Sequence, residues 1–198
     1  MPCDRDSDLE DQYHLYDKET ILVEDFCADG PILDIGGGGE GIIGLLKGHQ
    51  VIAIDVRKSE LEEAPDGPLK IVADARDLPF LDETFNVSTA FFSMMYIRQL
   101  AELQRIFAEA YRVLRPNGRF FLWDAVVERP ALMDKDAYIT FVRVLVANRE
   151  IHTGYGQPWP NERRDPAFYV ALAEEAGFAT ITKEGSGRLF FLGFRRPG

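Results

Sequence analysis

The chain has 198 residues, 46% hydrophobic and 28% charged, with a formal net charge of −11. This length and composition predict one globular domain, residues 1–198, with a substantial core. The negative charge argues against a general binder of nucleic acid or of anionic membranes, because both need a basic surface. Two cysteines, Cys3 and Cys27, provide no disulfide framework, and no apolar run or N-terminal signal indicates a membrane or secreted protein, so we expect the cytoplasm.

Residues 1–30 are expected to form an N-terminal segment that contains a helix at Lys18–Ala28, because its apolar residues fit one helical face. Tyr13 and Tyr16 precede this helix. Two interpretations remain open for them: a lid over a pocket, or a surface pair that packs the helix.

A short apolar run, Ile32–Ile35, is followed by four glycines, Gly36–Gly39, and by a segment with helical spacing, Ile42–Leu46. A strand, a glycine turn and a helix form the first half of a nucleotide-binding βαβ unit. The glycines let the backbone turn sharply and let a ligand approach it closely. The stretch also contains G-x-G-x-x-G, a pattern that on its own indicates a dinucleotide only weakly.

Asp34 lies two residues before the first glycine. A dinucleotide would bring an anionic pyrophosphate to this turn, where an acid is unfavourable. S-adenosylmethionine has no phosphate and carries an ammonium and a sulfonium cation, so an acid beside the turn suits it better.

Acids also end the next two predicted strands. The strand Val51–Asp55 ends in Asp55, about 20 residues after the first glycine, where an acid can accept hydrogen bonds from ribose hydroxyls. The strand Leu69–Ala73 is followed by Asp74, which can accept from an adenine amino group. Asp55 as a simple cap of the following helix is the alternative.

A fourth strand is predicted at Phe85–Phe92, a helix with one buried face at Leu100–Leu114, and a fifth strand at Arg119–Val126. Tyr96 lies in the segment expected beyond the fourth strand. Strands joined by helical or long connections predict a parallel sheet with helices on both faces.

Residues 137–160 interrupt this alternation. Val, Ile, Thr, Tyr and Phe are frequent in residues 137–147, which predicts an inserted β-hairpin followed by an aromatic loop, with a helix as the alternative. We expect this insertion to cap the pocket, with Tyr155, Trp159 and His152 among its walls. A homodimer contact through Ile139, Phe141 and Leu145 is the competing interpretation.

The C-terminal part predicts one more helix and a closing hairpin. Asp165 is placed to cap a helix with Pro166 at its first position, and Gly177 ends it. Thr180–Lys183 and Leu189–Arg195 are the two strands of an antiparallel hairpin.

Together, the motifs I-L-D-I-G-G-G, V-I-A-I-D and A-D-A-R-D-L-P-F resemble those of class I S-adenosylmethionine-dependent methyltransferases, mainly over residues 31–127. The resemblance implies a Rossmann-like three-layer α/β sandwich with a mostly parallel seven-stranded sheet, in the order 3-2-1-4-5-7-6, and an antiparallel last strand. It implies S-adenosyl-L-methionine as the cofactor. The cofactor-binding residues would be Asp34, Gly36, Gly37, Gly38, Asp55, Val56, Asp74, Ala75 and Phe91.

One departure from the family pattern is Glu40, which stands where a third glycine is usual. The implied activity is methyl transfer to a small molecule, which needs alignment rather than a fixed catalytic motif, and the sequence identifies no catalytic residue. His14 and His152 are candidate bases, and no cluster with metal-ligand spacing is present. A nicotinamide-dependent oxidoreductase and a non-catalytic S-adenosylmethionine-binding module remain as alternatives.

Overall fold

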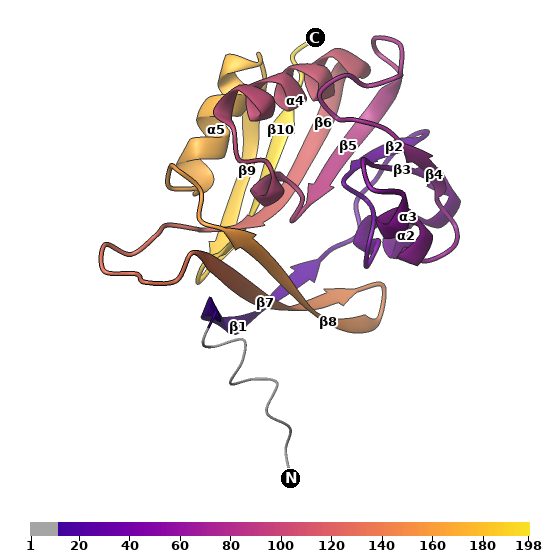
Figure 1. Cartoon of the computed structure of the whole chain (residues 1–198). Coiled ribbons are helices and arrows are strands. Elements are labelled where there is room, and N and C mark those ends of the chain that lie inside the picture. The colour runs from indigo at the N-terminus through magenta and orange to yellow at the C-terminus, as the bar shows by residue number, and fades with distance from the viewer. Residues whose placement is uncertain (1–11) are drawn as a thin grey trace.

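The computed structural model describes residues 12–198 and has a central seven-stranded sheet with the order β4-β3-β2-β5-β6-β10-β9 (Figure 1). In that order the strands are Leu69–Val72, Val51–Asp55, Ile32–Ile35, Phe85–Phe91, Leu114–Ala125, Leu189–Arg195 and Ala179–Ser186. Strands β4 to β6 pair in parallel, whereas β10 is antiparallel to both of its neighbours. The predicted sheet order and the antiparallel last strand are therefore confirmed.

One face of this sheet is covered by the helices α4, Leu100–Val113, and α5, Pro166–Glu175. Leu103 and Phe107 of α4 and Tyr169 of α5 are fully buried in the core on this side. Helix α5 begins as predicted, because the Asp165 carboxylate accepts a hydrogen bond of 2.9 Å from the Phe168 amide.

The opposite face is covered by the short helix α2, Ile42–Lys47, and by a separate three-stranded sheet. The smaller helices on this half of the chain are η1, Gly48–Gln50, and α3, Lys58–Glu63, and a further 3-10 turn, η2, spans Met94–Tyr96. The third layer is therefore part helix and part sheet, which differs from the expectation of helices on both faces.

The three-stranded sheet consists of β1, Tyr13–Val23, β7, Ala137–Val146, and β8, Arg149–Pro158. Strand β1 pairs in parallel with β7, and β7 pairs with β8 as an antiparallel hairpin. The two-residue connection, Ala147 and Asn148, has φ angles of 46° and 61°, as a tight hairpin turn requires. The inserted hairpin is thus confirmed over the helix alternative.

The helix expected at Lys18–Ala28 is wrong, because residues up to Val23 belong to strand β1. Ile21 and Val23 are buried, whereas Leu22 between them is 57% exposed, so the burial has the period of two of a strand. The aromatic loop expected after the hairpin is also shorter than predicted, because β8 continues to Pro158. Residues 1–11, with Cys3, lie outside the described part.

No helix within residues 12–198 is long and apolar enough to cross a membrane. In the same range, no three His, Cys, Asp or Glu side chains are grouped to hold a metal ion. Cys27 is an exposed free thiol.

Candidate active site

A cavity of about 910 Å³ lies at the carboxyl ends of β2, β3, β4 and β5 and is bounded on one side by β8. Ligands of open α/β sheets bind at this edge. The cavity is lined by every residue expected at the cofactor: Asp34, Gly36, Gly37, Gly38, Asp55, Val56, Asp74, Ala75 and Phe91. Of the residues expected at the substrate, Tyr96 and Tyr155 line it.

The glycine turn follows β2 and is fixed by its backbone. The amides of Gly36 and Gly37 both donate to the Ile54 carbonyl oxygen, at 2.8 and 3.0 Å. A Cβ atom on Gly37 would lie 2.5 Å from Asp34 Oδ2, so no larger residue fits there without a shift. The turn therefore presents bare backbone to the cavity, as the close approach of a ligand requires.

Asp34 supports this turn from beneath. Its side chain is 2% exposed, and Thr89 Oγ1 donates to its Oδ1 at 2.7 Å. Burial raises the pKa of Asp34 to about 7, against the opposing effect of the Thr89 hydrogen bond. The carboxyl group is thus buried beneath the turn, and its raised pKa means that it is less readily ionised than an exposed acid. From its position in the sequence we expected a fully charged acid that attracts the cations of the cofactor.

Asp55 ends β3 at the rim of the cavity. Its Oδ1 accepts from the Arg57 amide at 2.8 Å, and its Oδ2 is directed toward Gly38. This bond forms a turn ahead of α3 and does not cap that helix, so the cap alternative is wrong. The carboxylate also borders the cavity, where it can accept from hydroxyl groups of a ligand.

Asp74 lies after β4 and forms a fork with Arg76, whose Nη2 is 2.6 Å from Asp74 Oδ2. The Arg76 guanidinium holds the pKa of Asp74 below its usual value. Arg76 also pairs with Glu102 of α4. The acid is therefore charged and oriented, with 40% of its side chain still exposed.

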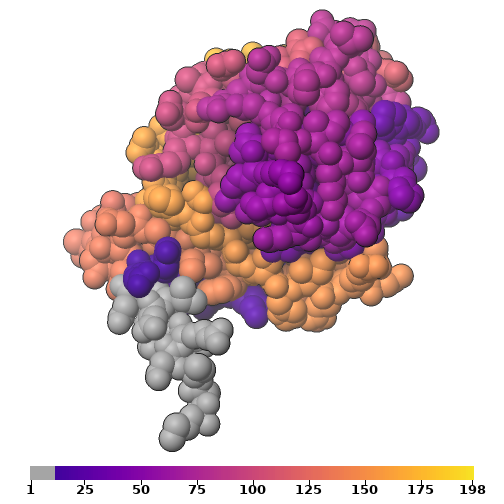
Figure 2. Space-filling model, turned by 45° about the vertical axis from the view of Figure 1, so that its right-hand side comes forward, coloured from indigo at the N-terminus to yellow at the C-terminus, as the bar shows by residue number. Residues whose placement is uncertain are grey.

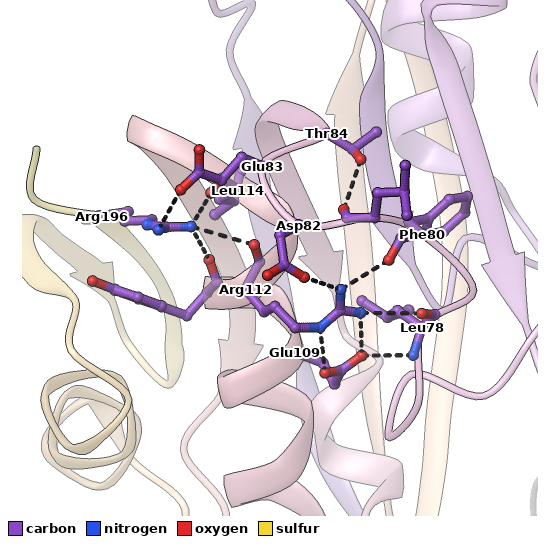
Figure 3. A network of polar contacts seen from close by, with 11 residues as sticks. Leu78, Phe80, Asp82, Glu83, Thr84, Glu109, Arg112, Leu114 and Arg196 are labelled. Carbon is purple, nitrogen blue, oxygen red and sulfur yellow. Dashed lines mark hydrogen bonds and ion pairs between the residues drawn. The ribbon is translucent and has the colours of Figure 1, made fainter.

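The loop that carries Asp74 is anchored on α4 by Arg112 and Glu109 (Figure 3). The Arg112 guanidinium donates to the carbonyl oxygen of Phe80 at 2.8 Å, and Glu109 accepts from the Leu78 amide at 2.7 Å. Charge-assisted bonds to backbone atoms fix a loop more firmly than surface ion pairs do. The helix therefore positions one wall of the cavity.

The other end of the cavity is aromatic. Phe92 directly follows β5 with a φ of 48°, a conformation that bulky residues rarely adopt and that often marks a functional site. Its ring stacks on Tyr155 of β8 at 4.7 Å between centroids. In the space-filling view the hairpin, in orange, lies directly beneath the violet surface of the α2 and α3 region (Figure 2).

Four residues expected at the substrate do not line the cavity. The Tyr16 ring lies under the Arg188 guanidinium and near Trp159, so it packs the small sheet and forms no lid. Trp159 is 5% exposed, and its Nε1 donates to the Lys135 carbonyl oxygen at 2.9 Å. His152 is exposed and pairs with Glu150 at 2.8 Å, and Tyr13 borders a separate hollow on the small sheet.

Sequence reasoning missed several lining residues, among them Glu40, Arg57, Glu60, Phe92 and Gln157. Glu40 was visible as a departure from the glycine pattern. The hydrogen bond that Glu40 accepts from Thr153 Oγ1 could not be predicted from the sequence, because the two residues lie far apart in the chain.

Asp124, at the end of β6, does not line the cavity but is fully buried beside it in the sheet. The Tyr169 hydroxyl donates to its Oδ2 at 2.9 Å, and the Ala125 amide donates to its Oδ1 at 2.8 Å. Burial raises the pKa of Asp124 to about 7, opposed by these hydrogen bonds and by Arg164.

A family model described as a methyltransferase domain matches residues 33–122. The ubiquinone/menaquinone biosynthesis C-methyltransferase UbiE of Methylobacterium nodulans is 34% identical over 119 residues, which are 57% of this chain and 46% of that protein. The mitochondrial 2-methoxy-6-polyprenyl-1,4-benzoquinol methylase of Xenopus laevis is 28% identical over 153 residues, which are 70% of this chain and 48% of that protein. The chain thus spans about half the length of these curated relatives.

Among solved structures, a SAM-dependent methyltransferase from Methanosarcina mazei matches with a TM-score of 0.59 at 18% identity, over 87% of this chain and 94% of that chain. Fold and cavity together define a Rossmann-like α/β domain with its ligand site at the carboxyl edge of the sheet. Residues 33–122 thus match a methyltransferase domain, and the chain shares its fold with S-adenosylmethionine-dependent methyltransferases, a similarity that implies S-adenosylmethionine as the cofactor.

Proposed function

We propose that the protein is a cytoplasmic, single-domain enzyme that transfers a methyl group from S-adenosylmethionine to a small molecule. The observation that carries this is the convergence of the bare glycine turn, Asp55 and Asp74 on one cavity. Its volume of about 910 Å³ lies near the top of the range of small-ligand sites, about 300–1,000 Å³, so it has room for a cofactor and an acceptor.

The residues present fit this cofactor. The backbone of Gly36–Gly38 offers a cradle that a Cβ atom would fill, and Asp55 and the loop of Asp74 offer acceptors for hydroxyl and amino groups. When bound, S-adenosylmethionine supplies an already activated methyl group. The chain therefore has to bind, align the acceptor and exclude water, which are tasks for the walls of the cavity.

Calorimetry of the full chain with S-adenosylmethionine, S-adenosylhomocysteine and NAD tests this proposal. We expect both sulfur compounds to bind and NAD not to bind. NAD binding without S-adenosylmethionine binding would identify the oxidoreductase alternative. Tight cofactor binding without turnover over a broad panel of acceptors would identify the non-catalytic module.

We also propose that residues 137–160 cap the aromatic end of the cavity, beside Phe92 and Tyr155, which we call the acceptor end. In support, Gly154, Tyr155, Gly156 and Gln157 of β8 line it.

The outward face of the same sheet carries the partly exposed Ile139, Phe141 and Leu145, together with Leu22, which is 57% exposed. A second copy of the chain is the occupant we propose for that face, and a nucleic acid is disfavoured by the net charge of −11. Light scattering of wild type against Phe141→Glu tests for the dimer, and a wild-type monomer would contradict it.

A further inference from the structure

Glu40 links the glycine turn to the inserted hairpin. It lies in the turn between β2 and α2, lines the cavity, and accepts a hydrogen bond from Thr153 Oγ1 of β8. Because Thr153 is a neutral donor, this bond orients the carboxylate without neutralising it. Within residues 12–198, no Lys, Arg or His forms an ion pair with Glu40.

Two tyrosines lie close to this carboxylate. Burial raises the pKa of Tyr96 to about 12, and it also raises the pKa of Tyr155; the negative charge of Glu40 adds to both effects. Both hydroxyls are therefore neutral at physiological pH. Glu40 is the one anion of this trio, and the ring of Tyr155 is held rigidly against Phe92.

Four of the five other acids that line the cavity have partners or roles already, and the fifth, Glu63, is an exposed residue of α3. Asp74 pairs with Arg76, and Glu60 lies 3.3 Å from Arg57. Asp34 is buried with its pKa raised to about 7, and Asp55 faces the turn. Glu40 therefore has no ion-pair partner in the part of the chain that the structure describes, because the Arg57 guanidinium, which lies 5.9 Å from the centre of the Tyr96 ring, pairs with Glu60 instead. A carboxylate beside aromatic rings is the usual arrangement that recognises an organic ammonium group.

We propose that Glu40, Tyr96 and Tyr155 form an acceptor subsite for an amine carried on an apolar group. The inference rests on the proposed function and names its substrate class. Glu40 would hold the nitrogen, and the aromatic rings and Gln157 would surround the apolar part, because all of them line one cavity.

In this subsite the amine would be methylated at its nitrogen. The ammonium first releases one proton to solvent, and the free amine stays hydrogen-bonded to the Glu40 carboxylate. The lone pair of the freed nitrogen then forms the new N–C bond to the donated methyl group, while the C–S bond breaks and its electron pair stays on sulfur. The nitrogen becomes positively charged as it reacts, and the anionic Glu40 and the ring faces stabilise that charge.

The test is calorimetry on the full chain saturated with S-adenosylhomocysteine. The probes are phenethylamine, its neutral counterpart 2-phenylethanol and the anionic phenylacetate. We expect phenethylamine to bind at least about tenfold more tightly than either counterpart, because a charge-assisted bond exceeds a neutral one. Glu40→Gln should lose about tenfold in phenethylamine affinity while its affinity for S-adenosylhomocysteine changes less than about twofold.

Glu62→Gln is the matched control, because Glu62 is an exposed acid of α3 that pairs with Lys58. It removes the same charge and should change neither affinity. Thermal unfolding of each variant checks that it is folded, and if Glu40→Gln does not fold, the three probes on the wild type still decide.

Binding of S-adenosylhomocysteine without preference for phenethylamine would overturn the amine subsite and leave the proposed function intact. An equal loss of both affinities in Glu40→Gln would assign Glu40 to the cofactor and also overturn the inference. Absence of S-adenosylhomocysteine binding would instead refute the proposed function.

Discussion

Asp124→Asn should change the pH dependence of stability. Burial raises the pKa of Asp124 to about 7, so the folded protein holds a proton that the unfolded chain releases above about pH 4. Stability therefore falls as the pH rises through this window and levels off above about pH 7. A shift of this size costs the wild type roughly 2 to 3 kcal/mol between pH 5 and pH 8. The amide cannot ionise, and it can still accept from Ala125 and donate to Tyr169.

Urea unfolding followed by tryptophan fluorescence at pH 5, 6, 7 and 8 measures this difference. The variant should gain about 2 to 3 kcal/mol relative to the wild type from the lowest to the highest pH. Asp34, whose pKa is also raised to about 7, titrates in both proteins and cancels in the comparison. Asp66→Asn, at an exposed acid, is the control. Parallel stability profiles for wild type and Asp124→Asn would refute the reasoning.

Asp55→Ala should weaken S-adenosylmethionine binding by about 2 kcal/mol in a folded protein, because charge-assisted hydrogen bonds are lost; unchanged affinity by calorimetry would leave Asp55 only as the acceptor for the Arg57 amide. Gly37→Ala should lower both cofactor affinity and the melting temperature, costing about 1–3 kcal/mol, because its Cβ would lie 2.5 Å from Asp34 Oδ2; wild-type values for both would contradict the cradle. Trp159→Ala should lower the free energy of unfolding by about 3–5 kcal/mol, because the ring is buried outside the cavity. Cofactor affinity should stay unchanged below the melting temperature of the variant; a variant of wild-type stability that fails to bind the cofactor would place Trp159 in the site instead of the core.

The central sheet could be predicted from the sequence because its information is local. Val51–Asp55 is a short apolar run that ends in an acid, and the structure places β3 at the same residues. The glycines after Ile35 similarly fix where β2 ends and where the ligand edge lies. Since parallel strands share one carboxyl edge, the cofactor side of the cavity follows from strand order and strand ends.

The small sheet could not be predicted in the same way, because its stability comes from distant residues. Residues 18–28 are compatible with a helix on spacing alone, but residues 19–23 pair with β7, a neighbour that a sequence window does not contain. Tyr155 and Trp159 are also alike as aromatic residues of one segment. Whether each side chain faces the cavity or the core depends on how β8 lies against the central sheet. In the structure Tyr155 lines the cavity, whereas Trp159 is bonded to the Lys135 carbonyl oxygen outside it.

The parallel pairing of β1 with β7 also sets an order of assembly. Tyr13 pairs with Ala137 and Val23 with Val146, so β1 leaves the ribosome well before the strand with which it pairs. Strands β2 to β5 need no residue beyond Phe91 to pair with one another. Long-range pairing is slow because loop closure precedes the contacts that reward it. During synthesis strands β2 to β5 therefore precede the hairpin of β7 and β8, and Ile21 of β1 stays uncovered in the nascent chain until the hairpin arrives.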